Sequence, residues 1–384
     1  MDLTLDRMER FWESSGMPDL PVVHVVGTNG KGSTAAFFAS LARAHGLKVG
    51  VFTSPHFLTM RERVQINRAM LSQARWVELA NAILSAPAGA ELTYFEFQTC
   101  LAMLAFRQER VDVAVMEAGL GGRFDATNVF APELVLYTPI GMDHEKVLGD
   151  TLAAIARDKA GALRAGSCGV TGPQDPDALL ELENRAEAVG ARLMYAVDMA
   201  EPVAARRLGI PGIHQTVNAR LALAGWRWFA AGHDLKSETD KEIFGLETAF
   251  LPGRFQRVDV DGREVILDGA HNPHALAALK AALAASGSEP GCVIFSCMED
   301  KDLDAMVPMV RDLTPGPVLA VPMAYDRACR TERLAETFGE KAVVLDSLEA
   351  ALAEGSKYSS PTLICGSLYL LADFYTLYPH FLTA

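Results

Sequence analysis

The chain has 384 residues, of which 50% are hydrophobic and 22% are charged. This composition is typical of a globular protein and argues against long disordered tracts. A single hydrophobic core stops growing at roughly 250–300 residues, so the length predicts two domains. The formal net charge of −13 would repel a phosphate backbone, which argues against a non-specific nucleic-acid binder. A small anionic ligand stays compatible with this charge, because local donors can override the overall field.

The N-terminal segment carries charges of both signs and lacks an apolar stretch, so we expect no signal peptide. No later stretch approaches the roughly 18 uninterrupted apolar residues that a membrane helix needs. The six cysteines are scattered and form no CxxC pair. Free thiols in the cytoplasm are the natural interpretation of that pattern.

Short apolar runs alternate with helical patterns along the first part of the chain. This alternation predicts an α/β fold with a parallel sheet covered by helices. The expected strands are 20–26, 48–52, 111–116 and 134–137, and the expected helices are 33–45, 72–85, 93–109 and 151–164.

Pro252 and Gly253 interrupt this alternation. Strand and helix patterns resume after them, with strands expected at 265–267, 292–295 and 318–321 and a helix expected at 273–286. We therefore expect one domain at 1–250, a hinge at 251–255 and a second domain at 256–384.

A glycine-rich loop lies between the first predicted strand and the first predicted helix. It reads Gly27, Thr28, Asn29, Gly30, Lys31, Gly32, Ser33, Thr34. Glycines let backbone N–H groups point at a phosphate, and the lysine and the helix N-terminus add positive charge. The match to GxxxxGK[ST] is imperfect, because Val25 replaces the first glycine and Gly32 separates the lysine from the hydroxyl. The alternative to a nucleotide-binding loop is a simple turn that caps the helix. The lysine flanked by glycines favours the nucleotide-binding loop.

Polar loops also follow the other predicted strands. They contain Ser54, Glu117 and His144. Taken singly, these could be a turn residue, a solvated strand end and an ordinary loop histidine. In an open parallel sheet, however, ligands bind beyond the carboxyl ends of the strands, where these loops gather. Their shared placement favours a metal–nucleotide site.

A series of motifs then carries a resemblance to a known family. In chain order they are GTNGKGS, TSPH, TYFEF, EAGLGGRFDATN, GMDHEKVLGDT, IARDKAG, HQxxNA, LPGR, LDGAHNPHA, EDKD and CGSLYL. Together they resemble folylpolyglutamate synthase/dihydrofolate synthase of the Mur ligase superfamily, from Gly27 to about Leu370. The resemblance implies an N-terminal P-loop ATPase domain and a smaller Rossmann-like C-terminal glutamate-ligase domain, with ATP between them.

The resemblance also implies a reaction. L-Glutamate would be joined to dihydropteroate, to the γ-carboxylate of (tetrahydro)folate polyglutamates, or to both, at the expense of ATP and through an acyl phosphate. Mg²⁺ is expected at two sites, with Mn²⁺ as a possible substitute, because like-charged groups must be shielded while they react. The expected protein is a monomer with small-molecule substrates and no nucleic-acid or membrane partner.

Two alternatives stay open at this point. The first is another amino-acid ligase of the Mur superfamily, against which TYFEF and the DATN segment argue. The second is a non-catalytic nucleotide-binding paralogue, which would be expected to have lost part of the lysine and metal-binding set. That set is intact here.

The implied metal ligands are Ser54, Glu117, His144 and a carbamate of Lys159. The implied catalytic residues are Lys31, Lys159, Glu117 and His144. A carbamate forms only on a neutral amine, so the pKa of Lys159 would have to be depressed. The simpler interpretation of Lys159 is an exposed helix lysine paired with Asp158 or Asp150.

The implied ATP contacts extend from the loop to the second domain. They are Gly27, Thr28, Asn29, Gly30, Lys31, Gly32, Ser33, Asn218, Arg254, Asp268 and His271. Arg254, in the hinge, would reach the phosphates as the domains close and water is excluded. Without the resemblance, the segment from Asp268 to Pro273 would be no more than a helix N-cap.

The implied pterin contacts are Thr93, Tyr94, Phe95, Glu96, Phe124, Asp125 and Ala126. Phe95 would offer a ring face for stacking, although an aromatic residue at helical spacing is more often core. Lys301 is a candidate partner for the carboxylates of the acceptor glutamate, and a solvated helix cap is the alternative for it. The region 200–215 looks trimmed, which leaves the choice of acceptor open.

Overall fold

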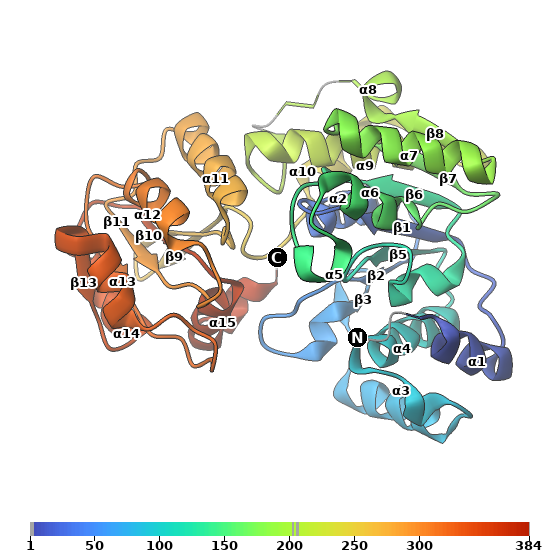
Figure 1. Ribbon diagram of the computed structural model, residues 1–384, viewed down its shortest axis with the longest axis horizontal. Helices are drawn as coiled ribbons and strands as arrows, with labels where there is room; N and C mark the ends of the chain where they lie inside the picture. Colours follow the sequence, from blue (N-terminus) through green and yellow to red (C-terminus); the bar gives the residue numbers. More distant parts are fainter. Residues whose placement is uncertain (1–3, 202, 205–206, 384) are drawn as a thin grey trace. The chain divides into compact units, whose positions relative to one another are not determined.

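The computed structural model describes residues 4–201, 203–204 and 207–383. The chain forms two compact units, one made of 1–204 with 216–249 and the other of 205–215 with 250–384. In each unit a sheet carries helices on its faces (Figure 1). Within the described residues, no helix has both the length and the apolar character needed to cross a membrane.

The first unit is built on an eight-stranded sheet with the order β4-β3-β2-β5-β1-β6-β7-β8. Its strands are β1 (Val22–Val26), β2 (Val49–Phe52), β3 (Val64–Ile66), β4 (Ala69–Met70), β5 (Val113–Glu117), β6 (Leu134–Tyr137), β7 (Cys168–Thr171) and β8 (Arg192–Tyr195). The sheet is parallel from β2 to β8, and β3 and β4 add an antiparallel edge. The predicted strands of this unit are confirmed, with ends shifted by one or two residues.

The helices and 3₁₀ turns of the first unit follow the strands in alternation. They are α1 (Asp6–Ser15), α2 (Lys31–Ala44), α3 (Gln73–Ser85), α4 (Tyr94–Gln108), α5 (Glu145–Leu148), α6 (Leu152–Ala160), α7 (Pro176–Val189), α8 (Ala196–Met199), most of α9 (Ile213–Gly232), α10 (Thr239–Glu247), η1 (Met60–Arg63), η2 (Gly89–Glu91) and η3 (Ala126–Phe130). Helix α6 ends at Ala160 and not at the predicted 164, because Gly161, a poor helix former, follows it.

Both faces of this sheet are covered, and every residue of β1 and β5 is buried. Alternate strand residues such as Val22 and Met116 pack with α4 in one core cluster. Helix α2 packs against β1, β2 and β5. Strand β1 lies between β5 and β6, so the order of the strands reverses beside it. The carboxyl end of β1 is therefore the topological switch point, where α/β sheets bind their ligands.

The second unit contains a six-stranded sheet with the order β13-β12-β11-β14-β10-β9, in which only β9 is antiparallel. Its elements are β9 (Gln256–Val260), β10 (Arg263–Leu267), α11 (Pro273–Ser286), β11 (Cys292–Phe295), α12 (Leu303–Arg311), β12 (Val318–Ala320), α13 (Thr331–Phe338), η5 (Gly339–Lys341), β13 (Ala342–Val344), α14 (Leu348–Gly355), β14 (Thr362–Cys365), α15 (Leu368–Leu377) and η6 (Pro379–Leu382). One core cluster joins the sheet to α11, α12 and α13. This confirms the predicted Rossmann-like architecture.

Candidate active site

The glycine-rich loop joins β1 to α2, at the switch point of the first sheet. Gly27 and Gly30 have φ angles of +156° and +88°, which side-chain-bearing residues rarely adopt. A Cβ atom on Gly27 would collide with Thr138, and one on Gly30 would collide with the Asn218 amide. The loop is therefore held in one conformation, and the predicted ATP contact Asn218 lies directly against it.

Further hydrogen bonds fix the middle of this loop. The backbone N–H groups of Thr28 and Asn29 donate to the Pro139 carbonyl at 3.0 and 3.3 Å. The Thr28 hydroxyl is 3.0 Å from both the carbonyl oxygen and the nitrogen of Gly141. These contacts tie the loop to the segment that follows β6.

Lys31 is the first residue of α2, and its ammonium group lies over the loop. Its Nζ donates to the carbonyls of Gly27 at 3.2 Å and of Thr28 at 3.1 Å. Within the described part of the chain, no side chain caps the start of α2. The first turn therefore presents N–H groups and a lysine together, an arrangement suited to a phosphate. Ser33 and Thr34, which follow, are buried.

Lys159 is buried, with 4% of its surface exposed, in the last turn of α6. Its Nζ donates to the Gly27 carbonyl at 2.9 Å. Burial first, and then the positive charge of Lys31, lower the pKa of Lys159 to about 8, against the opposing effect of nearby aspartates. The interpretation of Lys159 as an exposed helix lysine is wrong, because α6 packs it against the phosphate loop.

A small pocket brings several predicted residues together. Gly27, Thr28, Lys31, His144 and Lys159 line it with Asp143 and the 118–121 segment that follows β5. Three of the four predicted catalytic residues thus share one pocket. The fourth, Glu117, immediately precedes the lining segment.

Glu117 ends β5 and is only 5% exposed, so it is not a solvated strand end. Its Oε2 accepts a hydrogen bond of 3.0 Å from the Ser54 backbone N–H. The structure therefore brings the predicted ligands Ser54 and Glu117 together. Carboxylate and hydroxyl oxygens are ligands that Mg²⁺ accepts, so the two residue types fit this ion.

His144 is the N-cap of α5, with a left-handed φ of 53° and a side chain that is 56% exposed. Its Nε2 lies 3.7 Å from Asp143 Oδ2. Across the described residues, no three His, Cys, Asp or Glu side chains are grouped so as to hold a metal ion. A Mg²⁺ ion here would thus take most of its ligands from phosphate and water, as this ion commonly does.

Asp268 follows β10 in the second unit and is buried. Its carboxylate accepts hydrogen bonds of 2.9 Å from the backbone N–H groups of Phe255 and Ala270. Burial raises the pKa of Asp268, and the charge of Arg254 opposes that shift. Asn272, not Asp268, caps α11 by accepting from the Ala275 N–H at 2.8 Å. The interpretation of the 268–273 segment as a helix N-cap is therefore confirmed, with Asn272 as the capping residue.

Arg254 and His271 lie beside the same turn. Arg254 Nη1 donates to the Gly253 carbonyl at 3.0 Å, and a Cβ atom on Gly269 would contact this guanidinium at 2.5 Å. His271 Nδ1 lies 2.7 Å from the Gly269 carbonyl. The three predicted nucleotide contacts of the second unit, Arg254, Asp268 and His271, thus form one cluster.

The first turn of α4 contains the predicted TYFE segment. Thr93 and Glu96 form a capping box, in which the Thr93 N–H donates to Glu96 Oε2 at 2.7 Å. Tyr94 is 58% exposed. The partly buried ring of Phe95 lies 5.6 Å from that of Phe52 and directly on the backbone of Gly119, where a Cβ atom would be 2.5 Å away. This turn therefore contacts the loop that follows β5.

The side chain of Asp125 holds the loop after β5 through hydrogen bonds to its backbone. Its buried carboxylate accepts hydrogen bonds from the backbone N–H groups of Gly119 and Leu120, each at 2.9 Å, and of Thr127 at 3.0 Å. Burial raises its pKa, and these donors oppose the shift. Beside it, Ala126 is buried and Phe124 is 38% exposed. The side chain of Asp125 therefore shapes the segment in which Phe124 lies.

Comparisons with known proteins agree with this architecture. Residues 253–368 match the family described as "Mur ligase, glutamate ligase domain". A folylpolyglutamate synthase of Lacticaseibacillus casei is 32% identical over 91% of this chain and 87% of the relative. The Escherichia coli dihydrofolate synthase/folylpolyglutamate synthase is 33% identical over 97% of this chain and 90% of the relative. The chain belongs to the folylpolyglutamate synthase/dihydrofolate synthase family.

Other relatives of the family differ in length. This chain spans 46% of a probable bifunctional folylpolyglutamate synthase/dihydropteroate synthase of Halobacterium salinarum, to which it is 34% identical. A solved folylpolyglutamate synthase of Mycobacterium tuberculosis complexed with ADP superposes with a TM-score of 0.88 at 28% identity, over 98% of this chain and 95% of that one. An E. coli FolC in complex with DHPP and ADP gives a TM-score of 0.87 at 30% identity, over 99% and 94%. The resemblance expected from the motifs is confirmed.

Two further buried polar residues, which lie outside the motif assignments above, hold the loops beside the site. Glu62 accepts the backbone N–H groups of Phe57, Leu58 and Thr59 at 2.8, 2.7 and 2.6 Å, and so folds the loop after TSPH. The T-x-x-E spacing of a capping box was a signal for it. His24 Nε2 lies 2.6 Å from the Thr127 hydroxyl, and burial lowers its pKa to about 3. Nothing local in the sequence indicates this second contact.

Replacing Asp125 by alanine is expected to lower the free energy of unfolding by about 3 kcal/mol, because buried N–H groups of the loop lose their acceptor. Urea unfolding measures this change. Asp19, which is exposed, provides the control, and Asp19→Ala should stay within about 0.5 kcal/mol of the wild type. Equal stabilities of the two variants would contradict the role given to Asp125.

Proposed function

We propose that this family member joins L-glutamate to dihydropteroate, to a folate γ-carboxylate, or to both, in an ATP-dependent reaction. The observation that carries the proposal is the pocket in which Lys31 and Lys159 both donate to the Gly27 carbonyl of the phosphate loop. The names of the L. casei and E. coli relatives, and the ADP bound in two solved neighbours, support it.

The residues around the loop fit the activation step. A carboxylate at neutral pH is a poor electrophile, and the γ-phosphoryl group of ATP turns it into an acyl phosphate. In that step an O–P bond to the carboxylate forms while the bond from the γ-phosphorus to the β–γ bridging oxygen breaks. The first turn of α2 and the ammonium group of Lys31 would hold the phosphates during transfer, which is largely a matter of positioning and charge.

The glutamate amine then completes the reaction. Its nitrogen attacks the acyl carbon, the carbon–oxygen bond to phosphate breaks, and a proton leaves the nitrogen. Water would destroy the acyl phosphate, so the buried part of the pocket wall, at Gly27 and Lys159, favours amide formation over hydrolysis.

Mg²⁺ would be held at Ser54 and Glu117, which a hydrogen bond from the Ser54 backbone N–H to the Glu117 carboxylate brings together. The ion would supply charge neutralisation of the phosphates. The assignment of His144 as a further ligand rests on the pocket that it shares with Lys31 and Lys159. Histidine nitrogen is softer than the oxygen ligands that Mg²⁺ prefers, which is why we include Mn²⁺ in the proposal.

We propose in addition that Lys159 carries a carbamate. With a pKa of about 8, roughly a tenth of the amine is neutral at pH 7, whereas an ordinary lysine is almost entirely charged. The ammonium group first loses one proton, and the neutral nitrogen then attacks CO₂ and loses a second proton, so that a buried cation becomes an anion. Such an anion could bind a second metal ion next to the phosphate loop.

The pteridine ring is assigned to the aromatic residues beside Gly119. Phe95 lies on the backbone of Gly119, Tyr94 is 58% exposed, and Phe124 follows in the same loop at 38% exposure. Exposed or half-buried rings offer faces on which a flat heterocycle can stack. Thr93, Glu96, Asp125 and Ala126 would support these rings through the capping box and the loop hydrogen bonds.

A substrate comparison tests the proposed function. We expect glutamate-dependent phosphate release with dihydropteroate, with tetrahydrofolate, or with both, and a product heavier by one glutamyl residue in mass spectrometry. Release with only one of the two acceptors would identify a monofunctional enzyme. A chain that releases no phosphate with either acceptor, while a muropeptide or another carboxylate supports release, would contradict the proposal.

The remaining expectations stay predictions. They are the hinge at 251–255, the monomeric state, the cytoplasmic location, the absence of a nucleic-acid partner, and the nucleotide contacts of Arg254, Asp268 and His271. Size-exclusion chromatography with light scattering tests the monomer.

A further inference from the structure

Helix α1 lies along helix α4, and the two run in the same direction. In the first turn of α1, the Met8 sulfur is 3.4 Å from the Cys100 sulfur. Near its end, the Arg107 guanidinium lies 5.8 Å from the Trp12 ring and donates to the Ser15 carbonyl at 3.0 Å. Contacts therefore extend along both helices, which places the start of α1 beside the first turn of α4.

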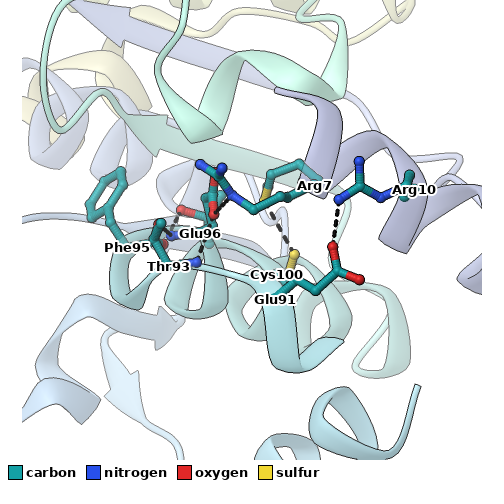
Figure 2. Close-up of polar contacts among 9 residues, drawn as sticks. Arg7, Arg10, Glu91, Thr93, Phe95, Glu96 and Cys100 are labelled. Carbon is teal, nitrogen blue, oxygen red and sulfur yellow. Dashed lines mark hydrogen bonds and ion pairs between the residues drawn. The ribbon is translucent and has the colours of Figure 1, made fainter. Parts of the chain in front are cut away.

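At that point Arg7 forms a two-pronged ion pair with Glu96. Arg7 Nε donates to Glu96 Oε2 at 3.0 Å, and Nη2 donates to Oε1 at 2.9 Å. The two side chains are only 18% and 8% exposed. Figure 2 shows this pair together with a second one, Arg10–Glu91, in which the side chains are 51% and 56% exposed. A largely buried, two-pronged pair between a guanidinium and a carboxylate is strong and directional, whereas an exposed ion pair contributes little to stability.

Glu96 links this ion pair to the cap of α4. Its Oε2 accepts both the Arg7 Nε–H and the Thr93 backbone N–H, the latter at 2.7 Å. Burial alone would raise the pKa of Glu96, but hydrogen bonds from Arg7 and Thr93 lower it below its usual value. The carboxylate that closes the capping box is thus kept charged by a residue of α1.

In the sequence Phe95 lies between Thr93 and Glu96, and its ring points away from Arg7 (Figure 2). The ring rests on Gly119 with no room for even one added carbon, since a Cβ atom there would be 2.5 Å from Phe95 Cζ. The position of the ring relative to the loop therefore depends on the position of the first turn of α4.

We propose that Arg7 is a positioning residue for the pterin substrate. Through Glu96 it fixes the first turn of α4, and through that turn it fixes the Phe95 ring on which the pteridine would stack. The inference rests on the proposed function, because it requires a pteridine acceptor.

The test compares Arg7→Met with Arg10→Met, the matched change in the exposed pair of the same helix. We expect Arg7→Met to raise the KM and Kd for the pteridine acceptor about tenfold, while kcat and the KM for ATP stay within about twofold. Arg7→Lys should lower the acceptor KM about threefold relative to Arg7→Met. Lysine keeps the positive charge but cannot make the two parallel hydrogen bonds of a guanidinium group. Arg10→Met should leave all four values unchanged.

Glu96→Gln supplies a second and independent variant. Glutamine can still close the capping box through its one oxygen, but it has no charge and no second acceptor for Arg7, so the fold is retained while the two-pronged ion pair is lost. We expect it to raise the acceptor KM as Arg7→Met does, and the double variant to be no worse than either single one.

The outcomes separate this inference from the proposed function. A lower melting temperature without a change in acceptor KM would show a purely structural ion pair and overturn the inference. Equal rises in the KM for ATP and for the acceptor would overturn it too. If the wild-type chain binds neither dihydropteroate nor tetrahydrofolate, the proposed function is wrong, and the inference that rests on it is wrong too.

Discussion

Alanine in place of Lys31 is expected to lower kcat by about 10³-fold while leaving the fold intact. The lysine donates to the Gly27 and Thr28 carbonyls and thereby places a positive charge over the phosphate loop. Without it, charge that develops on the transferring phosphoryl group would be left without a fixed partner. Glutamate-dependent phosphate release measures the loss, and circular dichroism checks the fold.

Lys48→Ala is the control for this experiment. The side chain of Lys48 is 38% exposed, and it pairs with Glu109 at 3.1 Å. We expect it to keep wild-type activity. Turnover by the Lys31→Ala chain at a rate close to that of Lys48→Ala would rule out the phosphate-binding role of the loop lysine.

Lys159→Ala is expected to lower kcat by about 10²-fold or more, because it removes the group that would become the carbamate. A short carboxylic acid such as acetate should restore part of this activity by occupying the space with an anion. Lys146→Ala, a change at an exposed position of α5, should have no effect.

The carbamate also predicts a dependence on pH and CO₂. The folded-state pKa of Lys159 is lowered to about 8, so the neutral amine that reacts with CO₂ increases about tenfold between pH 7 and pH 9. At a fixed concentration of dissolved CO₂, enzyme freed of CO₂ should therefore regain activity faster at pH 8.5 than at pH 7. A ¹³C-bicarbonate spectrum without a carbamate resonance, in enzyme of full activity, would exclude the modification.

Much of the fold could be predicted because its signals are local. The strand, loop and helix around Gly27 to Lys31 depend on neighbouring residues, and the structure has them where the pattern puts them. The hairpin of β3 and β4 escaped prediction because its strands are too short to show a clear period. It explains why the sheet is not wholly parallel.

The site was only partly predictable, since several of its residues act through distant partners. Helical spacing placed Lys159 on a helix, but it could not show that the helix packs this lysine against Gly27. Arg7 and Glu96 are 89 positions apart in the sequence, and no local pattern joins them. The local N-cap rule holds for Asn272, but it could not show that the Asp268 carboxylate accepts a hydrogen bond from the distant Phe255 N–H.

One carbonyl oxygen, that of Gly27, accepts hydrogen bonds from both Lys31 and Lys159. Two ammonium groups on one acceptor repel each other, and this repulsion contributes to the low pKa of Lys159. A phosphate that binds beside them would raise that pKa, so nucleotide binding near pH 8 takes up protons. Reaction of the same lysine with CO₂ releases a proton instead. The two ways of neutralising the pocket therefore have opposite proton balances, and ambient pH sets which of them is favoured.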